Sequence, residues 1–170
     1  MNIRDTLLEA HSKTQTEKVV AYVGDDPRRF AELMKLMLGP VYRLSQRAAG
    51  PVSYCIQRHP DLVTPYWAEL VDQLERDDAH IAVRRNVARL LQFVDIPKRH
   101  QGRIFDACYK LFANPAQPIA VRCFSMTVAV NIARDQPELI DELRLVVGEH
   151  LETSSAGLRS RARRLLGLGS

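Results

Sequence analysis

The sequence has no apolar run long enough to cross a membrane. Hydrophobic residues make up 46% of its 170 residues, but charged residues, prolines and glycines interrupt every apolar segment. A membrane helix needs roughly 20 consecutive apolar residues. The first residues, MNIRDTLLEAHSKTQTEK, mix charged with apolar residues and lack the uncharged core of a signal peptide. We therefore expect a soluble, cytoplasmic protein with no membrane partner.

Cysteine is scarce. Cys55, Cys108 and Cys123 are odd in number and stand among apolar and aromatic residues. This excludes a small domain held together by disulfides and favours reduced cysteines that pack in the interior.

Motifs for catalysis and for cofactor binding are missing as well. The sequence contains no G-x-S-x-G nucleophile motif and no glycine-rich phosphate loop. The five histidines are isolated from one another, whereas metal-binding helices place ligands three or four residues apart. They are His11, His59, His80, His100 and His150. We expect no catalytic site, no metal and no cofactor.

The charge is basic but uneven. There are 24 basic and 20 acidic residues, and the excess comes from residues 80–117 and from residues 156–170. The densest basic cluster consists of Arg84, Arg85, Arg89, Lys98, Arg99 and Arg103. These residues fall on different faces of two expected helices, so nucleic acid is a possible but less favoured partner.

A repeat with a period of 37 to 39 residues runs through the chain. FAELMKLML at 30–38 matches WAELVDQLE at 67–75, then IFDACYKLF at 104–112 and LRLVVGEHL at 143–151. The copies have apolar residues at i, i+3, i+4 and i+7, the pattern of one helix face, except that the fourth copy has His150 at i+7. The leading column is Phe30, Trp67, Ile104 and Leu143. These segments are the expected second helices of a helical hairpin repeat, and we expect that column to be buried.

The first helices form another column, Leu44, Val83, Val121 and Leu158. The last three are each followed by an arginine: Arg84, Arg122 and Arg159. The pattern predicts helices near 3–11, 14–23, 27–38, 41–58, 64–76, 80–94, 100–113, 118–133, 138–152 and 156–167. Because one hairpin cannot bury its own apolar face, neighbouring hairpins must stack. We expect one α-solenoid domain over residues 1–170, with a short N-terminal repeat (3–38), repeats at 41–76, 80–113 and 118–152, and a C-terminal capping helix (156–167).

V-R followed by an amphipathic helix, a turn and a second helix resembles the HEAT-like, armadillo-type repeat of α-solenoids. The resemblance implies an all-α fold, a short right-handed superhelix, and a non-enzymatic scaffold. In that family an acidic residue before V-R and the arginine commonly bridge adjacent repeats. Asp78 and Arg84 match this pattern, whereas Asn114 and Ser155 replace the acid before Arg122 and Arg159. Gly50-Pro51 is similar to the kinked first helix of the family.

One column of the second helices is acidic, with Glu32, Glu69 and Asp106. Beside it lie Arg29, Tyr66 and Arg103 on one side and Lys35, Asp72 and Tyr109 on the other. Tyrosine and arginine among charges are typical of recognition surfaces, so this face is the candidate contact surface for a protein or peptide. The alternatives are a solvated face and tyrosines that only cover helix edges.

Two other functions stay open. HEAT-like solenoids that resemble bacterial alkylpurine DNA glycosylases grip DNA in a basic groove with aromatic residues and an acid. Trp67, the one tryptophan, occupies the inward column, which favours a core role over a catalytic one. Self-association through exposed solenoid ends is the third possibility, and the arginine-rich last helix argues against it at the C-terminus.

Overall fold

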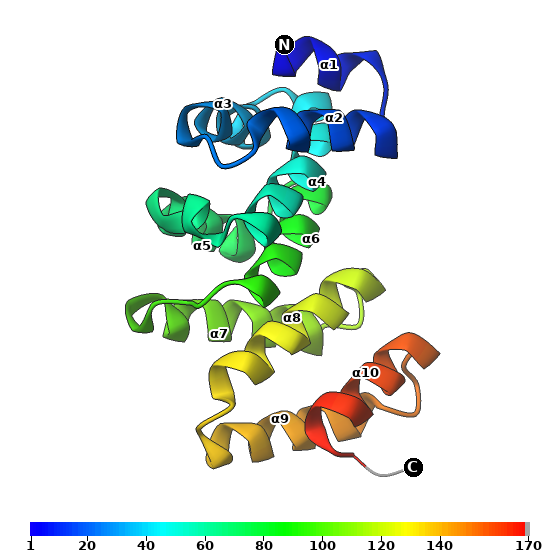
Figure 1. Ribbon diagram of the computed structural model, residues 1–170. Helices are drawn as coiled ribbons and strands as arrows, with labels where there is room; N and C mark the ends of the chain where they lie inside the picture. Colours follow the sequence, from blue (N-terminus) through cyan, green and yellow to red (C-terminus); the bar gives the residue numbers. More distant parts are fainter. Residues whose placement is uncertain (169–170) are drawn as a thin grey trace. The chain divides into compact units, whose positions relative to one another are not determined.

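The computed structural model describes residues 1–168, which are all-α: these residues contain ten α-helices and no strand. The described residues divide into two compact units, one of residues 1–95 and one of residues 96–168, and Figure 1 shows the helices of each. The all-α helical repeat fold expected from the sequence is confirmed. The expectation of one continuous domain stays a prediction.

The first unit contains six α-helices. They are α1 (Ile3–Glu9), α2 (Lys13–Val23), α3 (Pro27–Leu38), α4 (Tyr42–Arg58), α5 (Trp67–Glu75) and α6 (Ile81–Leu90). A 3-10 helix, Pro60–Tyr66, precedes α5, and a 3-10 turn, Leu91–Phe93, extends α6. Helix α4 is central in packing, since it contacts α1, α2, α3 and α6.

Polar side chains start the early helices by accepting hydrogen bonds from backbone amides that no helix bond uses. Asn2 accepts from the amide of Asp5 (3.1 Å), and Ser12 accepts from the amide of Gln15 (3.2 Å). Asp26 caps α3, and Pro27 follows at the first helical position, where a missing N–H is harmless.

The second unit contains α7 (Lys98–Ala113), α8 (Ile119–Ala133), α9 (Pro137–His150) and α10 (Ala156–Leu166). Extended Pro97 and Pro118 precede α7 and α8, and the Ser155 hydroxyl accepts from the amide of Leu158 (3.3 Å) at the start of α10. Within this unit α8 packs against α7, α9 and α10.

The repeat columns form the core. In the second-helix column Phe30 is 1% exposed, Trp67 5%, and Ile104 and Leu143 0%. Leu44, Val83, Val121 and Leu158 of the first helices are buried too. The burial predicted from the helical spacing is confirmed, including the core position of Trp67.

Two expected helix boundaries were wrong. The helix expected at 64–76 is α-helical only from Trp67, because Pro60 and Pro65 have no N–H to donate and the preceding turns form a 3-10 helix. The helix expected at 80–94 ends at Leu90 and tightens into a 3-10 turn. The sequence predicts Leu158, Ala162 and Leu165 on the apolar side of the last helix, but Leu165 is half-buried and Leu166 (1% exposed) is buried in its place.

Helix α4 continues through Pro51. The proline ring clashes with the Cβ of a preceding helical residue, and Gly50 has no Cβ. A Cβ added at Gly50 would meet no neighbouring atom within 4 Å, so the glycine lies beside open space. The Gly50-Pro51 pair therefore lets a helix of 17 residues carry an interior proline.

The arginines that follow the first-helix column donate to backbone carbonyls that precede their own helices. Arg84 donates to the backbone carbonyl of Arg76, at the end of α5. Arg122 Nε donates to the carbonyl of Phe112 in α7 (2.9 Å), and Arg159 donates to the carbonyl of Ser154 before α10. Arg84 and Arg122 thus join the start of one helix to the end of the helix before it, whereas Arg159 binds the connection directly before its own helix.

The expected direct pair of Asp78 with Arg84 needs correction. Asp78 accepts two hydrogen bonds from the guanidinium of Arg76, at 2.9 and 2.8 Å, and this pair is the main cause of the lowered pKa of Asp78. Arg84 contributes to that lowering only as a more distant charge. Arg84 is 7% exposed and needs a close acceptor, which the backbone carbonyl of Arg76 supplies.

Candidate binding surfaces

The nine candidate contact residues lie on second helices, or at the start of one, in both units. Arg29, Glu32 and Lys35 belong to α3, Tyr66 ends the 3-10 helix, and Glu69 and Asp72 belong to α5. Arg103, Asp106 and Tyr109 belong to α7 of the second unit. The seven charged side chains are exposed and the two tyrosines are half-buried. The structure therefore brings six of the nine into one unit.

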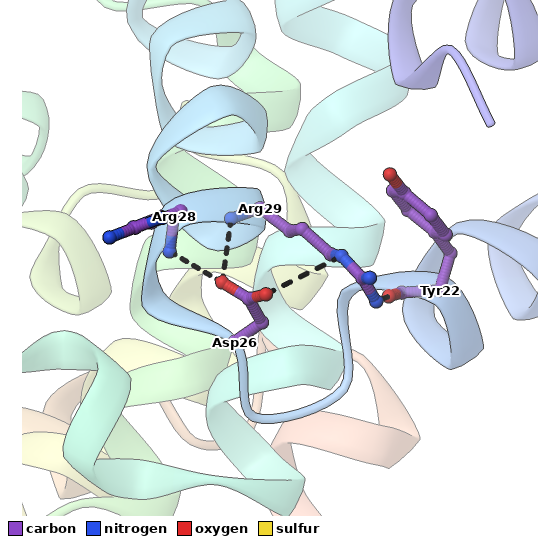
Figure 2. A network of polar contacts seen from close by, with 4 residues as sticks. All are labelled: Tyr22, Asp26, Arg28 and Arg29. Carbon is purple, nitrogen blue, oxygen red and sulfur yellow. Dashed lines mark hydrogen bonds and ion pairs between the residues drawn. The ribbon is translucent and has the colours of Figure 1, made fainter.

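Arg29 is held in a local network at the start of α3 (Figure 2). Asp26 accepts hydrogen bonds from the amides of Arg28 (2.8 Å) and Arg29 (3.2 Å), and these bonds lower the pKa of the Asp26 carboxyl. The guanidinium of Arg29 donates to the carbonyl of Tyr22 (2.8 Å) and lies 4.4 Å from the centre of the Tyr22 ring. Arg29 thus fastens the turn between α2 and α3, a structural role that its charge alone did not indicate.

Tyr66 lines a cavity of about 580 Å³ between the start of α3, the end of α4 and the 3-10 helix. Its ring meets Phe30 edge to face, with centroids 5.6 Å apart. Burial raises the pKa of Tyr66, and the nearby Glu69 carboxylate raises it further. The apolar lining is completed by Pro27, Pro60, Leu62 and Pro65. This lining suits an apolar side chain.

Charged and polar side chains surround that apolar lining. Asp25, Asp61, Arg58 and His59 also line the cavity. Sequence reasoning missed these residues because they come from three elements that only the fold brings together. The sequence feature that could have indicated this cavity is the pair of prolines, Pro60 and Pro65, which restricts the connection before α5 to a tight 3-10 helix.

The exposed charge of α5 is acidic. Its exposed residues are Ala68, Glu69, Asp72 and Glu75, and the helix carries no lysine or arginine. Helix α3 adds Glu32 but also Arg28, Arg29 and Lys35, so the acidic excess of these two helices lies on α5.

Tyr109 of the second unit packs among aromatic rings. Its centroid lies 5.3 Å from that of Phe112 and 6.2 Å from that of Phe105. Burial raises the pKa of Tyr109, and the Glu142 and Glu149 carboxylates of α9 add to the effect. These contacts match a ring that covers the edge of a helix, the alternative that the sequence left open.

A second cavity, of about 460 Å³, lies between the turn from α3 to α4 and the turn from α5 to α6. Tyr42 and His80 stack at its edge, with ring centroids 4.0 Å apart. His80 Nδ1 accepts from the amide of Ala82 (3.0 Å), and burial lowers the pKa of His80. Arg76 and Asp78 complete the polar lining as an ion pair of 2.8 Å.

The thiols give no sign of reactivity. Burial raises the pKa of Cys55 and of Cys108 to about 12, and it raises the pKa of Cys123 as well. Thiols with raised pKa values are poor nucleophiles at neutral pH. Among residues 1–168 no three histidine, cysteine or acidic side chains come together as metal ligands.

In the same described part of the chain, no helix combines the length and the apolar character that spanning a membrane requires.

Stacked hairpins with a buried periodic seam, joined by arginines at each repeat, define an α-helical repeat protein. A family model described as HEAT repeat domain matches residues 3–167. The chain therefore belongs to the HEAT repeat family, whose members are helical repeat scaffolds. No curated protein and no solved structure shows a significant match to it.

Proposed function

We propose that the protein is a non-enzymatic adaptor that binds a basic peptide segment of another protein on the second-helix face of its first unit. The observation that carries the proposal is the cavity of about 580 Å³ at Tyr66. An apolar side chain of the partner enters the cavity against Phe30, Tyr66 and the prolines. Short anchors of this kind supply most of the affinity of a peptide interface.

The charges around the cavity determine the sequence that it accepts. Asp25 and Asp61 line the cavity, and Glu69 follows Tyr66 by three residues, about one helical turn. Lysine or arginine beside the apolar anchor of the peptide meets these carboxylates. The partner is therefore a segment with one large apolar residue flanked by basic residues.

Selection from a library of random peptides displayed on phage tests the proposal. We expect enriched peptides to combine an apolar anchor with lysine or arginine. Binding of one such peptide, measured by fluorescence anisotropy, should weaken at least about tenfold in Thr64→Trp, because an interfacial anchor contributes on the order of 2 kcal/mol. Thr64 is exposed at the cavity wall, so the indole fills the cavity without disturbing the core.

Two charge-reversal variants test whether the Glu69 carboxylate contributes to peptide binding. Glu69→Lys should weaken the same peptide, whereas Glu138→Lys, an equal change at an exposed site of α9, should leave it unchanged. If the library yields no enriched sequence, or if Thr64→Trp binds the peptide as the unaltered protein does, the proposal is wrong.

A further inference from the structure

The carboxylates and the arginines are segregated between the two kinds of helix. The first helices α4, α6, α8 and α10 carry eleven arginines: three on α4, three on α6, one on α8 and four on α10. They contain no lysine, no aspartate and no glutamate. All 20 acidic residues of the chain lie on the other helices or in connections. The basic charge therefore gathers on one kind of helix.

In the first unit this charge forms a surface on two packed helices. Helix α4 packs against α6, and each carries a pair of arginines four residues apart, Arg43 with Arg47 and Arg85 with Arg89. Arg43 and Arg85 are exposed, and Arg47 and Arg89 are half-buried. Like charges at this spacing repel each other on a helix, and neither helix has a carboxylate to offset the repulsion. Arg47 instead donates to the α1 carbonyls of Leu7 (2.8 Å) and Leu8 (3.0 Å), which leaves Arg43, Arg85 and Arg89 as the arginines available to a ligand. We call all four arginines together the first-helix arginine surface.

Rings and glycine complete the surface. The guanidinium of Arg89 lies 4.3 Å from the centre of the Tyr54 ring, which connects α6 to α4 across the surface. Gly50 follows Arg47 on α4 and precedes Tyr54 by four residues, and a Cβ there would meet no atom within 4 Å. Tyr42 at the start of α4 is 66% exposed. The surface thus combines cations, aromatic rings and one bare stretch of helix backbone.

The second unit repeats the composition. Arg161 of α10 lies 5.5 Å from the centre of the Phe124 ring of α8 and donates to the Thr127 hydroxyl (3.3 Å). Arg163 and Arg164 of α10 are exposed. In both units, therefore, an arginine of the later first helix covers an aromatic ring of the earlier one.

The chemistry of the surface identifies the class of ligand. Protein interfaces have an apolar centre, but the large exposed apolar residues of α4 and α6, Tyr42 and Ile81, lie at the helix starts. Arginine binds phosphate through a fork of donors, and aromatic rings stack on unpaired bases. A cationic surface whose two helices carry no carboxylate, with the exposed Tyr42 ring at one end, suits a phosphate backbone better than a protein surface.

We propose that the first-helix arginine surface of α4 and α6 binds single-stranded nucleic acid. Arg43, Arg85 and Arg89 contact successive phosphates, and a base stacks on the face of the Tyr42 ring that His80 leaves open. The chain passes over Gly50, where the surface has no side chain. This surface shares helix α4 with the proposed peptide site, but none of its residues lines the cavity at Tyr66, so the failure of one proposal leaves the other standing.

Anisotropy of a fluorescein-labelled oligothymidylate of about 20 nucleotides, longer than a typical single binding module covers, tests the site. Titrations run between roughly 50 and 200 mM salt, where phosphate binding weakens steeply. The double variant Arg43→Gln, Arg85→Gln should bind at least about tenfold more weakly at the lower salt concentration. Its slope of log affinity against log salt should be shallower by about 1.4, because each lost phosphate contact removes about 0.7.

Matched variants exclude an effect of net charge alone. Arg28→Gln with Lys35→Gln removes two exposed charges from α3 and should change the affinity less than about twofold, since neither contacts the strand. Gly50→Glu should weaken binding, whereas Gly50→Gln, which has the same size and the same position before Pro51, should weaken it much less. Thermal unfolding of each variant verifies that it folds.

Four results would overturn the proposal. One is an absence of saturable binding by the oligonucleotide, and a second is an equal loss in the α3 variant. A third is displacement of the oligonucleotide by poly-glutamate as readily as by unlabelled oligothymidylate, which would indicate an acidic protein partner. The fourth is tighter binding of a duplex of the same length, which would show that the surface does not prefer single-stranded nucleic acid.

Discussion

At the scale of single residues, Asp26 controls the start of α3. The amides of Arg28 and Arg29 and the Arg29 guanidinium all favour its ionised form, so the pKa of Asp26 in the folded protein lies below its ordinary value of 3.8. A carboxyl group with a lowered pKa stabilises the fold above its unfolded pKa and loses that effect as the pH falls through the folded value.

We therefore expect Asp26→Asn to unfold at a lower temperature than the unaltered protein near neutral pH. The amide side chain still accepts a hydrogen bond but carries no charge. The difference in unfolding temperature between the two proteins should shrink below about pH 4, where Asp26 becomes protonated in the unfolded chain. It should vanish at the lower pH at which Asp26 is protonated in the folded protein as well. Thermal unfolding across this pH range measures it, and a difference that does not depend on pH would contradict the assignment.

The three cysteines should stay unreactive until the protein unfolds. Because burial raises the pKa of Cys55 and Cys108 to about 12, almost no thiolate exists at pH 8. A colorimetric disulfide reagent should label none of the cysteines quickly in native protein and all three in guanidinium. Ser160→Cys places a thiol at an exposed position of α10 and serves as the positive control. Rapid labelling of a native cysteine would show that its surroundings open in solution.

At the scale of helices, two leucines of α9 distinguish its buried face from its exposed face. Leu143 is 0% exposed and Leu145 is 70% exposed on the same helix. Leu143→Ala should lower the free energy of unfolding by about 2 to 5 kcal/mol, as deletions of a buried leucine do. Leu145→Ala should change it by less than about 0.5 kcal/mol. Urea unfolding measures both, and equal losses would mean that α9 does not pack by this face.

Helix periodicity predicted the fold well because burial repeats with the helix turn. The buried column of Phe30 and Ile104 followed directly from a spacing of i, i+3, i+4 and i+7. The i+7 position of the same pattern fails in the fourth copy, where His150 is exposed at the end of α9. Terminal turns have fewer neighbours, so periodicity determines burial less strictly there.

The candidate site was less predictable because it depends on contacts between elements. Charge and residue type pointed to Arg29, but its guanidinium binds the carbonyl of Tyr22, a backbone group that no pattern of side chains reveals. The residues around the cavity at Tyr66 come from α3, α4 and the 3-10 helix. The segregation of arginines on the first helices was visible in the sequence, but it appears only when first and second helices are counted separately.

At the scale of the whole molecule, α10 closes the second unit. Its residues Leu158, Ala162 and Leu166 are buried, and α10 packs against α8 and α9. Arg144 of α9 also donates to the carbonyl of Leu166 (2.9 Å). Terminal helices of this kind shield the apolar edge of a repeat array from water.

A chain that ends after Ser155 should therefore lose more than about 3 kcal/mol of stability, since burying each leucine contributes about 1.5 to 3 kcal/mol. The exposed edge should also cause association that increases with concentration. Gel filtration and thermal unfolding measure these effects. Arg163→Gln with Arg164→Gln keeps the apolar side of α10 and should stay monomeric. A shortened chain as stable as the full one would show that α10 is not a cap.

Arg84, Arg122 and Arg159 donate to backbone carbonyls of the chain and not to side chains. The type of acceptor affects how far the sequences of the repeats can diverge. The three acceptors belong to Arg76, Phe112 and Ser154, side chains with nothing in common. Every amino acid carries a backbone oxygen, so substitutions at these places leave the junction intact. Successive copies can therefore drift apart in sequence, and acquire separate surfaces, while the register of the array is preserved.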